Sequence, residues 1–193
     1  MAAALGKSGE ADRWLTDAER IRTLIVEKLY CPEEAAFYDL DAQNKFVRVR
    51  SDVISRVLGE HVLQLSNAHD RGIFEAVWTK QIHNPHAFWA SYPLTSIALD
   101  DPTFVRPIPR NSWGGASQAL TALRAPRWMI HYGKEAALDK LMQQWCKAIV
   151  RQLKFCQQID PLSGDFTQPD PGGYSPCALA FLDFARRLSN RAI

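Results

Sequence analysis

The segment between Trp89 and Gly115 carries the densest group of side chains that could bind a small polar molecule. Tyr92 and Trp113 offer flat apolar ring faces. Directed hydrogen bonds are available from four polar side chains of the same segment, Asp101, Arg106, Arg110 and Asn111. Sugars present C–H faces and hydroxyl edges, so rings combined with polar groups suit them. In the alternative interpretation, which composition alone favours, the prolines and aromatic residues only pack a long connector over the helix ends.

A second segment, residues 155–166, places polar side chains at the end of a predicted helix, followed by a turn rich in proline and glycine. Glycoside hydrolysis requires two carboxyl groups that flank the scissile bond, one acting as acid and the other as base or nucleophile. No local pattern in the sequence selects such a pair. Asp160 and its neighbours are also ordinary turn residues, so a purely structural role is the alternative for them.

Metal and cofactor chemistry is not expected. The five histidines contain no His-x-x-x-His spacing, and His83 and His86, which share a loop, are more typical of a surface. The four cysteines lie far apart without a Cys-x-x-Cys pair, which argues against a zinc cluster. Their even number permits two disulfides, whereas isolated cysteines commonly act as small buried hydrophobic residues.

Composition narrows the class of protein. The 193 residues are 47% hydrophobic and 23% charged, which is typical of a single globular domain spanning residues 1–193. The net charge of +2 is too balanced for a protein that binds nucleic acid or an anionic membrane. The sequence lacks an apolar run long enough for a transmembrane helix or a signal peptide. We therefore expect a cytoplasmic protein.

Helical periodicity dominates the chain. Apolar residues recurring every three or four positions predict helices near residues 10–30, 53–65, 71–82, 115–132 and 138–153, and a last helix that begins around Ser175. The first helix is expected to bury one stripe, formed by Trp14, Ala18, Ile21, Ile25 and Leu29. The last helix presents Leu179, Leu182, Ala185 and Leu188 in the same manner. Trp14, Trp128 and Trp145 are expected in the core.

Two stretches depart from this helical pattern. Apolar and basic residues alternate over residues 46–50, after turn-forming residues at 41–44, which predicts a small β-hairpin within residues 37–50. Residues 84–115 hold five of the eleven prolines and cannot form a long helix. A loop of this length inside a compact domain is more often functional than decorative.

The order of these features resembles the later half of an (α/α)6-barrel glycoside hydrolase, of the trehalase-like and mannosylglycerate-hydrolase-like kind (glycoside hydrolase families 37 and 63). Four stretches carry the resemblance: Ala36-Phe-Tyr-Asp-Leu-Asp41, Arg110-Asn-Ser-Trp-Gly-Gly115 with the helix that ends at Gly133, Phe155-Cys-Gln-Gln-Ile-Asp-Pro-Leu-Ser-Gly164, and Gly172-Gly-Tyr-Ser-Pro176. The fold that it implies is all-α, a partial α/α toroid with a small β-hairpin.

The resemblance also implies an inverting mechanism on an α-linked disaccharide or a small glycoside. Trp113 and Tyr92 would stack on the sugar, and the other substrate-binding residues would be Asp101, Arg106, Arg110, Asn111, Gln118 and Tyr174. The family's catalytic base is a glutamate at the position of Gln157, and a glutamine cannot accept that proton at neutral pH. Either another carboxylate, Asp160 or Asp101, takes the role of the base, or the site does not hydrolyse. Gln157 with Asp160 is the candidate water-handling position, and the general acid has no counterpart.

Such a barrel needs twelve helices, and this chain supplies about half of them. The uncovered helix faces predict an exposed apolar edge, together with a second chain or a missing N-terminal half that completes the barrel. The alternatives are a helical interaction module without catalysis and an inactive fragment of a larger glycosidase. An enzyme domain should gather the Trp113 loop and the loop of residues 157–174 into one concave pocket, whereas an interaction module need not.

Overall fold

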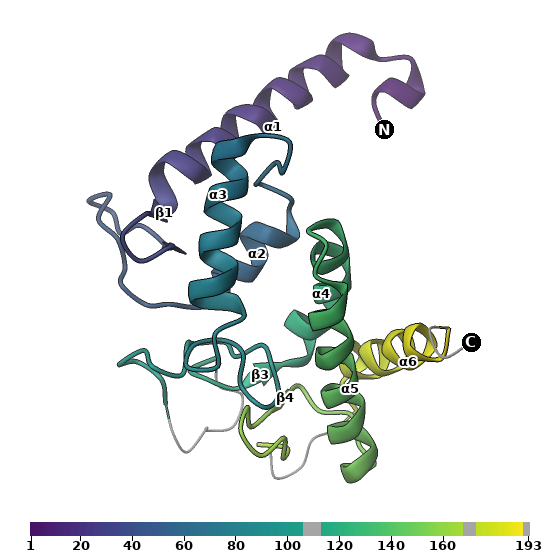
Figure 1. Cartoon of the computed structure of the whole chain (residues 1–193). Coiled ribbons are helices and arrows are strands. Elements are labelled where there is room, and N and C mark those ends of the chain that lie inside the picture. Colours follow the sequence, from purple (N-terminus) through teal and green to yellow (C-terminus); the bar gives the residue numbers. More distant parts are fainter. Residues whose placement is uncertain (106–112, 168–172, 191–193) are drawn as a thin grey trace.

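The computed structural model describes residues 1–105, 113–167 and 173–190 (Figure 1). Within these ranges the chain forms six α-helices: α1 (Ser8–Leu29), α2 (Val53–Gly59), α3 (Ala68–Val77), α4 (Ala119–His131), α5 (Glu135–Gln152) and α6 (Ser175–Ser189). A 3₁₀ turn, Ala3–Leu5, precedes α1, and a π-helical turn, Trp78–Ile82, extends α3. Four two-residue strands are β1 (Tyr30–Cys31), β2 (Ala36–Phe37), β3 (Ser117–Gln118) and β4 (Gln158–Ile159).

One hydrophobic core runs through these elements. Helices α4, α5 and α6 pack against one another, and α2 packs against α4. Trp128 and Trp145 are among the largest fully buried side chains, which confirms the prediction for these two residues. The predicted face of α5 is buried as far as Ile149, but Leu153 is exposed because it follows the helix in a left-handed conformation.

The prediction for the first helix is wrong in one respect. Helix α1 forms, and Ile25 and Leu29 of the predicted stripe pack against the core, but none of the side chains of α1 is fully buried and Trp14 keeps 61% of its surface exposed. Figure 1 shows the reason, because the N-terminal half of α1 stands clear of the rest of the chain. Periodicity correctly identifies an apolar stripe, but it does not say whether another element covers that stripe.

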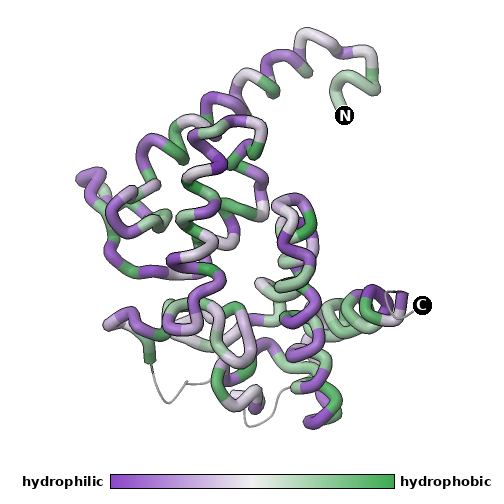
Figure 2. Tube along the Cα trace, viewed as in Figure 1, coloured by the Kyte–Doolittle hydropathy of each residue, from purple (hydrophilic) through white to green (hydrophobic). Residues whose placement is uncertain are grey.

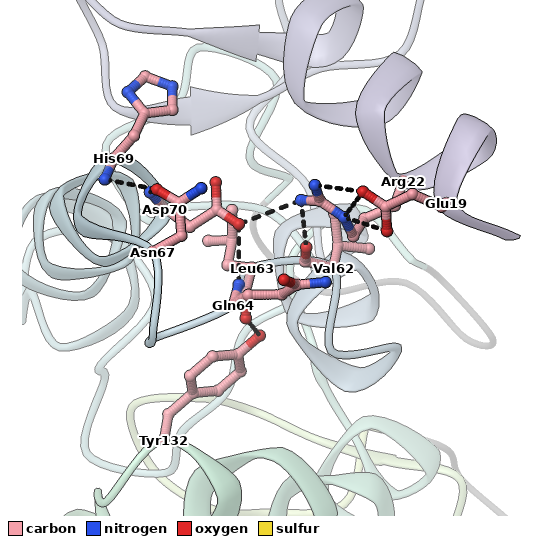
Figure 3. A network of polar contacts seen from close by, with 9 residues as sticks. All are labelled: Glu19, Arg22, Val62, Leu63, Gln64, Asn67, His69, Asp70 and Tyr132. Carbon is pink, nitrogen blue, oxygen red and sulfur yellow. Dashed lines mark hydrogen bonds and ion pairs between the residues drawn. The ribbon is translucent and has the colours of Figure 1, made fainter. Parts of the chain in front are cut away.

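The C-terminal half of α1 is held against the rest of the chain by a polar network (Figure 3). Arg22 donates hydrogen bonds to Asp70 Oδ2 at 3.1 Å and to the Val62 carbonyl at 3.3 Å. The same Asp70 oxygen accepts the backbone N–H of Gln64 at 2.9 Å. Because Asp70 is buried at the start of α3, the network fixes α1 against the segment that joins α2 to α3.

The prediction for the last helix is only partly correct, because Leu188 packs against the core as expected but the fully buried residues lie on a different face. Cys177, Ala180 and Phe184 point into the core, whereas Leu179 and Leu182 are exposed. The small residues allow α6 to pack closely on α4 and α5. The expected exposed apolar edge is therefore present, and the described residues place it on α1 and α6.

The β-hairpin lies earlier than predicted. The regular pairing joins β1 to β2, with Cys31 opposite Ala36. The predicted turn at residues 41–44 does form, and a single bridge between Leu40 and Phe46 flanks it. Residues 47–50 form no ladder. Helix α2 ends at Gly59 rather than near residue 65, because the chain turns through a left-handed residue, His61.

The long proline-containing loop is confirmed as non-helical wherever it is described. All four cysteines are free and three of them are buried, which agrees with the interpretation as small buried residues and not with two disulfides. His83 and His86 are exposed. Among the described residues, no helix is both long and apolar enough to cross a bilayer. The cellular location stays a prediction.

Candidate functional site

Short strand pairings bring the predicted binding segments together. β3 and β4 are antiparallel, with Ser117 opposite Ile159. Single bridges extend this pairing on both sides, from Ser117 to Thr95 and from Ile159 to Phe166. Segments that are far apart in the sequence, near residues 95, 117, 159 and 166, therefore lie side by side at one end of α4.

Buried amides reinforce the pairing of β3 with β4. The Gln118 side-chain Nε2 donates to Gln158 Oε1 at 3.0 Å, and Gln158 Nε2 donates to Thr167 Oγ1 at 2.6 Å. Both glutamines are buried. Gln118 is a predicted substrate contact, and the structure shows that its buried side chain binds Gln158 and so links β3 to β4.

The two residues of the candidate water-handling position lie on this joined edge. Gln157 is half-buried, and its backbone carbonyl accepts the N–H of Ala119, the first residue of α4, at 2.9 Å. Asp160 Oδ1 accepts the backbone N–H groups of Leu162 at 2.8 Å and Ser163 at 3.1 Å. Asp160 thus forms a turn, which is the structural role that the sequence analysis gave as the alternative to a catalytic one.

Two more predicted binding residues are buried in the same region. The Tyr92 ring packs over Gly164, and its backbone N–H donates to the Pro161 carbonyl at 2.9 Å. Asp101 accepts hydrogen bonds from the Arg50 backbone and from Thr103, and these outweigh burial and lower the pKa of Asp101. Asp101 therefore holds its own loop in place.

The remaining predicted residues divide into two groups. Trp113 is 39% exposed and Tyr174 is half-buried. Arg106, Arg110 and Asn111 lie outside the described residues. Trp113 is the only predicted binding residue, among those described, that lines the large cavity between α2 and α4.

This cavity, which we name the Asp52 pocket, has a volume of about 540 Å³, and Trp113 is one of its lining residues. Its walls come from one face of each helix: Asp52, Ser55, Arg56, Gly59 and Glu60 from α2 and its ends, and Leu120, Thr121, Arg124, Arg127 and Trp128 from α4. Because α4 begins directly after β3, the pocket adjoins the joined loops. None of its described lining residues comes from residues 157–167 or 173–174, so this pocket does not join the Trp113 loop to the loop of residues 157–174 as expected of an enzyme domain.

Asp52 is the buried carboxyl group of this pocket. It precedes α2 but does not cap the helix; its Oδ2 accepts the Thr121 hydroxyl at 3.1 Å, and its Oδ1 lies 3.2 Å from the Arg56 guanidinium. Burial raises the pKa of Asp52 above its ordinary value, although Arg56, Thr121 and Arg124 all favour the ionised form. A carboxyl group of this kind can hold a proton that an exposed one would lose.

Cationic and aromatic groups surround the pocket. The Arg56 guanidinium lies 5.6 Å from the centroid of the Trp113 ring, a cation–π contact that places this ring beside the pocket. Arg127 lies 3.6 Å from Glu60 Oε2, and both side chains are exposed. Three arginines and two carboxyl groups therefore line one cavity, a set able to hydrogen-bond a polyhydroxy ligand or an anion.

Sequence analysis missed the charged residues of the Asp52 pocket. The available signal was helical spacing, because Asp52, Arg56 and Glu60 are four residues apart and share one face, as do Thr121, Arg124 and Arg127 at three-residue steps. On a single helix, a face of this kind looks like an ordinary solvent-exposed surface, and it forms a pocket only when the two helices pack together. Among the described residues, no group of three or more histidine, cysteine or acidic side chains could hold a metal ion.

Three solved structures share this architecture. A sialidase aligns with a TM-score of 0.81 at 15% identity, over 96% of this chain and 18% of the sialidase. The GH63 mannosylglycerate hydrolase from Thermus thermophilus, in complex with glucose, aligns with a TM-score of 0.70 at 18% identity, over 96% of this chain and 43% of that one. Neutral trehalase Nth1 from Saccharomyces cerevisiae gives a TM-score of 0.68 at 13% identity, over 91% of this chain and 30% of the trehalase.

These alignments confirm the α/α toroid fold, and the chain spans less than half of the length of each of the three structures. At the level of sequence, the model of the mannosylglycerate hydrolase MGH1-like glycoside hydrolase domain matches residues 1–176. A comparison with curated proteins found no significant match.

Proposed function

Because the chain belongs to the family of mannosylglycerate hydrolase MGH1-like glycoside hydrolase domains, we propose that it binds an α-linked disaccharide or small glycoside in the Asp52 pocket. One observation carries the proposal: a buried carboxyl group and an exposed tryptophan face the same cavity, between two helices next to the joined loops. Trp113 supplies a face for the sugar ring, and Asp52 supplies a hydrogen-bonding group shielded from water.

The charges of the pocket favour a ligand that carries a carboxylate next to its hydroxyl groups. Arg124 and Arg127 line the pocket and are exposed at its surface, so they are accessible to an anionic group. Glycerate is such a group. Arginine suits it because the guanidinium presents several donors in a plane that matches a carboxylate.

We also propose an inverting mechanism for any hydrolysis that occurs here. The two carboxyl groups among the described lining residues of the pocket are those of Asp52, just before α2, and Glu60, just after it. An inverting enzyme uses one carboxyl group as the general acid and a second one as the general base that activates a water molecule. In this proposal Asp52 donates the proton to the leaving group, and Glu60 activates the water.

A second candidate function is sugar binding without hydrolysis, by a non-catalytic module or an inactive fragment. Gln157 favours this second candidate, because a side-chain amide cannot act as a base. Asp160 also favours it, because its Oδ1 accepts two backbone hydrogen bonds within a turn. Under this alternative the pocket retains its ligand affinity while the chain releases no product.

The test is a calorimetric titration of the purified chain with glucose, trehalose and D-glycerate, together with a hydrolysis assay on 4-nitrophenyl α-glycosides. Trp113→Ala should weaken binding about tenfold, a loss of about 1.4 kcal/mol. Leu162→Ala is the matched control, since Leu162 is 43% exposed on the neighbouring loop outside the pocket. Binding unaffected by Trp113→Ala would remove this residue from the site, and binding without hydrolysis would select the second candidate.

A further inference from the structure

Two histidines lie face to face where the connection between α2 and α3 meets the end of α4. The rings of His61 and His131 are parallel to within 3°, and their centroids are 3.9 Å apart. His61 follows α2 in a left-handed backbone conformation, and His131 is the last residue of α4. The Tyr132 ring stands edge-on to both imidazoles. The stack therefore joins the connection, residues 60–66, to the C-terminal end of α4.

Other contacts at this junction are few in kind. The Tyr132 hydroxyl donates to the Leu63 carbonyl at 3.1 Å (Figure 3). Arg127 lies 3.6 Å from Glu60, but both side chains are exposed, and such pairs contribute little to stability. The ring stack is therefore a main contact by which the connection is held on α4.

The stack can carry one proton more easily than two. A neutral imidazole packs well on a charged one, whereas two charged rings 3.9 Å apart repel each other. His61 is half-buried, so water screens this repulsion only in part. Its Nε2 is buried and makes no hydrogen bond among the described residues. Burial lowers the pKa of His61 below its ordinary value, and the charges of His131 and Arg127 lower it further.

The neighbouring acidic groups do not cancel this repulsion. Glu60 favours the charged form of His61, but it is exposed and already paired with Arg127. Figure 2 shows hydrophilic residues along the length of α1, and two of them, Glu19 and Arg22, line a groove together with His61. These two are hydrogen-bonded to each other. The charged and titratable groups around the stack are Glu19 and Arg22 of α1, Glu60 after α2, Asp70 of α3, and Arg127 and Tyr132 at the end of α4.

We propose that the His61–His131 stack is a pH-sensitive latch, which holds residues 60–66 on the end of α4 at neutral pH and releases them when both rings are protonated. Because the pKa of His61 is lowered in the folded chain, the unfolded chain binds this proton more tightly. The stability that the latch provides is thus complete above about pH 6.5 and is lost as the pH falls from there through the lowered pKa.

Release of the latch also affects the Asp52 pocket. Glu60 directly precedes His61, Arg127 lies one helical turn before His131, and both line the pocket. One wall of the pocket therefore depends on the junction that the stack holds. The proposal itself does not depend on the proposed function, because opening of the connection can be measured without any ligand.

The first experiment measures backbone hydrogen exchange of the full chain at about pH 7.5 and about pH 5, with each rate divided by its intrinsic value at that pH. The N–H groups of His61 and Gln64 donate to the Leu58 carbonyl and to Asp70 Oδ2, so their exchange reports opening of the connection. We expect their protection to be at least about tenfold lower at the acid pH, while the N–H groups of α5 keep theirs. Equal protection at both pH values overturns the proposal.

Matched variants separate the stack from a general effect of acid. His131→Phe keeps a ring against His61 but cannot be protonated, so this variant should lose the fall in protection. His86→Phe makes the same change at an exposed histidine outside the stack and should behave as the wild type does. His61→Asn should also lose the fall at Gln64, and asparagine tolerates the left-handed backbone. A fall as large in His131→Phe as in the wild type overturns the latch.

The second experiment tests the coupling of the two charges by an NMR titration of the imidazole protons. His131→Phe removes a repelling charge, so it should raise the titration midpoint of His61 by at least about half a pH unit. His86→Phe should leave this midpoint unchanged. Circular dichroism at neutral pH shows whether each variant is folded. An unchanged His61 midpoint in folded His131→Phe means that the rings do not sense each other's charge, and this result overturns the proposal.

Discussion

Gly164 lies directly under the ring of Tyr92. A Cβ atom on Gly164 would come within 2.6 Å of Tyr92 Cε1 and Cε2, closer than real Cβ atoms approach. The backbone of Gly164 is also left-handed, with φ of +73°. Two loops separated by about seventy residues are thus in contact through the absence of one side chain, and this contact keeps the segment of residues 157–166 on the edge of β3.

Gly164→Ala is expected to lower the free energy of unfolding by about 2–4 kcal/mol. The left-handed backbone accounts for about 1 kcal/mol and the clash with the Tyr92 ring for about 1–3 kcal/mol. Gly133→Ala is the matched control, because Gly133 has φ of +66° but nothing within 4 Å of an added Cβ. Urea denaturation of both variants measures the difference, and equal losses would mean that the ring contact contributes nothing.

Asp52→Asn is expected to change the pH dependence of stability. Because burial raises the pKa of Asp52, the folded chain binds this proton more tightly than the unfolded chain, and wild-type stability falls as the pH rises from about 3.8 through the raised pKa. The asparagine variant lacks this loss. Its stability relative to wild type should therefore increase with pH across that window, as thermal unfolding from about pH 3 to about pH 8 would measure.

Asp183→Asn provides the control of opposite sign. Burial alone would raise the pKa of Asp183, but hydrogen bonds and ion pairs with Arg187 and Arg186 outweigh it and lower the pKa. The ionised form stabilises the fold above the lowered pKa, so this variant should lose stability relative to wild type as the pH rises. If both variants follow the wild-type profile in parallel, the two carboxyl groups do not differ as their surroundings indicate.

Arg22→Met is expected to cost about 3 kcal/mol of unfolding free energy. It leaves the buried carboxylate of Asp70, which is 3.1 Å from the guanidinium in the wild type, without its counter-charge. The double variant Arg22→Met/Asp70→Asn removes both charges and should recover part of this loss. Chemical denaturation of the two single variants and the double variant completes the cycle, and strict additivity would contradict a direct interaction.

Much of the scaffold could be predicted from residue spacing. Helix α5 and its buried face could be predicted from the positions of Leu138, Leu141 and Trp145, because apolar residues at this spacing lie on one side of a helix. Trp14 and Leu179 show where this reasoning fails. The same spacing identifies an apolar face on their helices, but only the neighbouring elements decide whether that face is covered.

For the candidate site as well, one part could be predicted from the sequence and another part required the tertiary structure. Residue type and local spacing were enough to predict the helical scaffold, the proline-containing loop and the polar and aromatic residues that resemble a glycosidase. The folded chain was needed to see that Asp160 forms a turn, that Gln118 binds Gln158, and that Asp52 shares a pocket with Trp113. Burial and hydrogen bonding depend on which helices and loops pack together, and partners such as Asp52 and Thr121 are sixty-nine positions apart, beyond the reach of any local pattern.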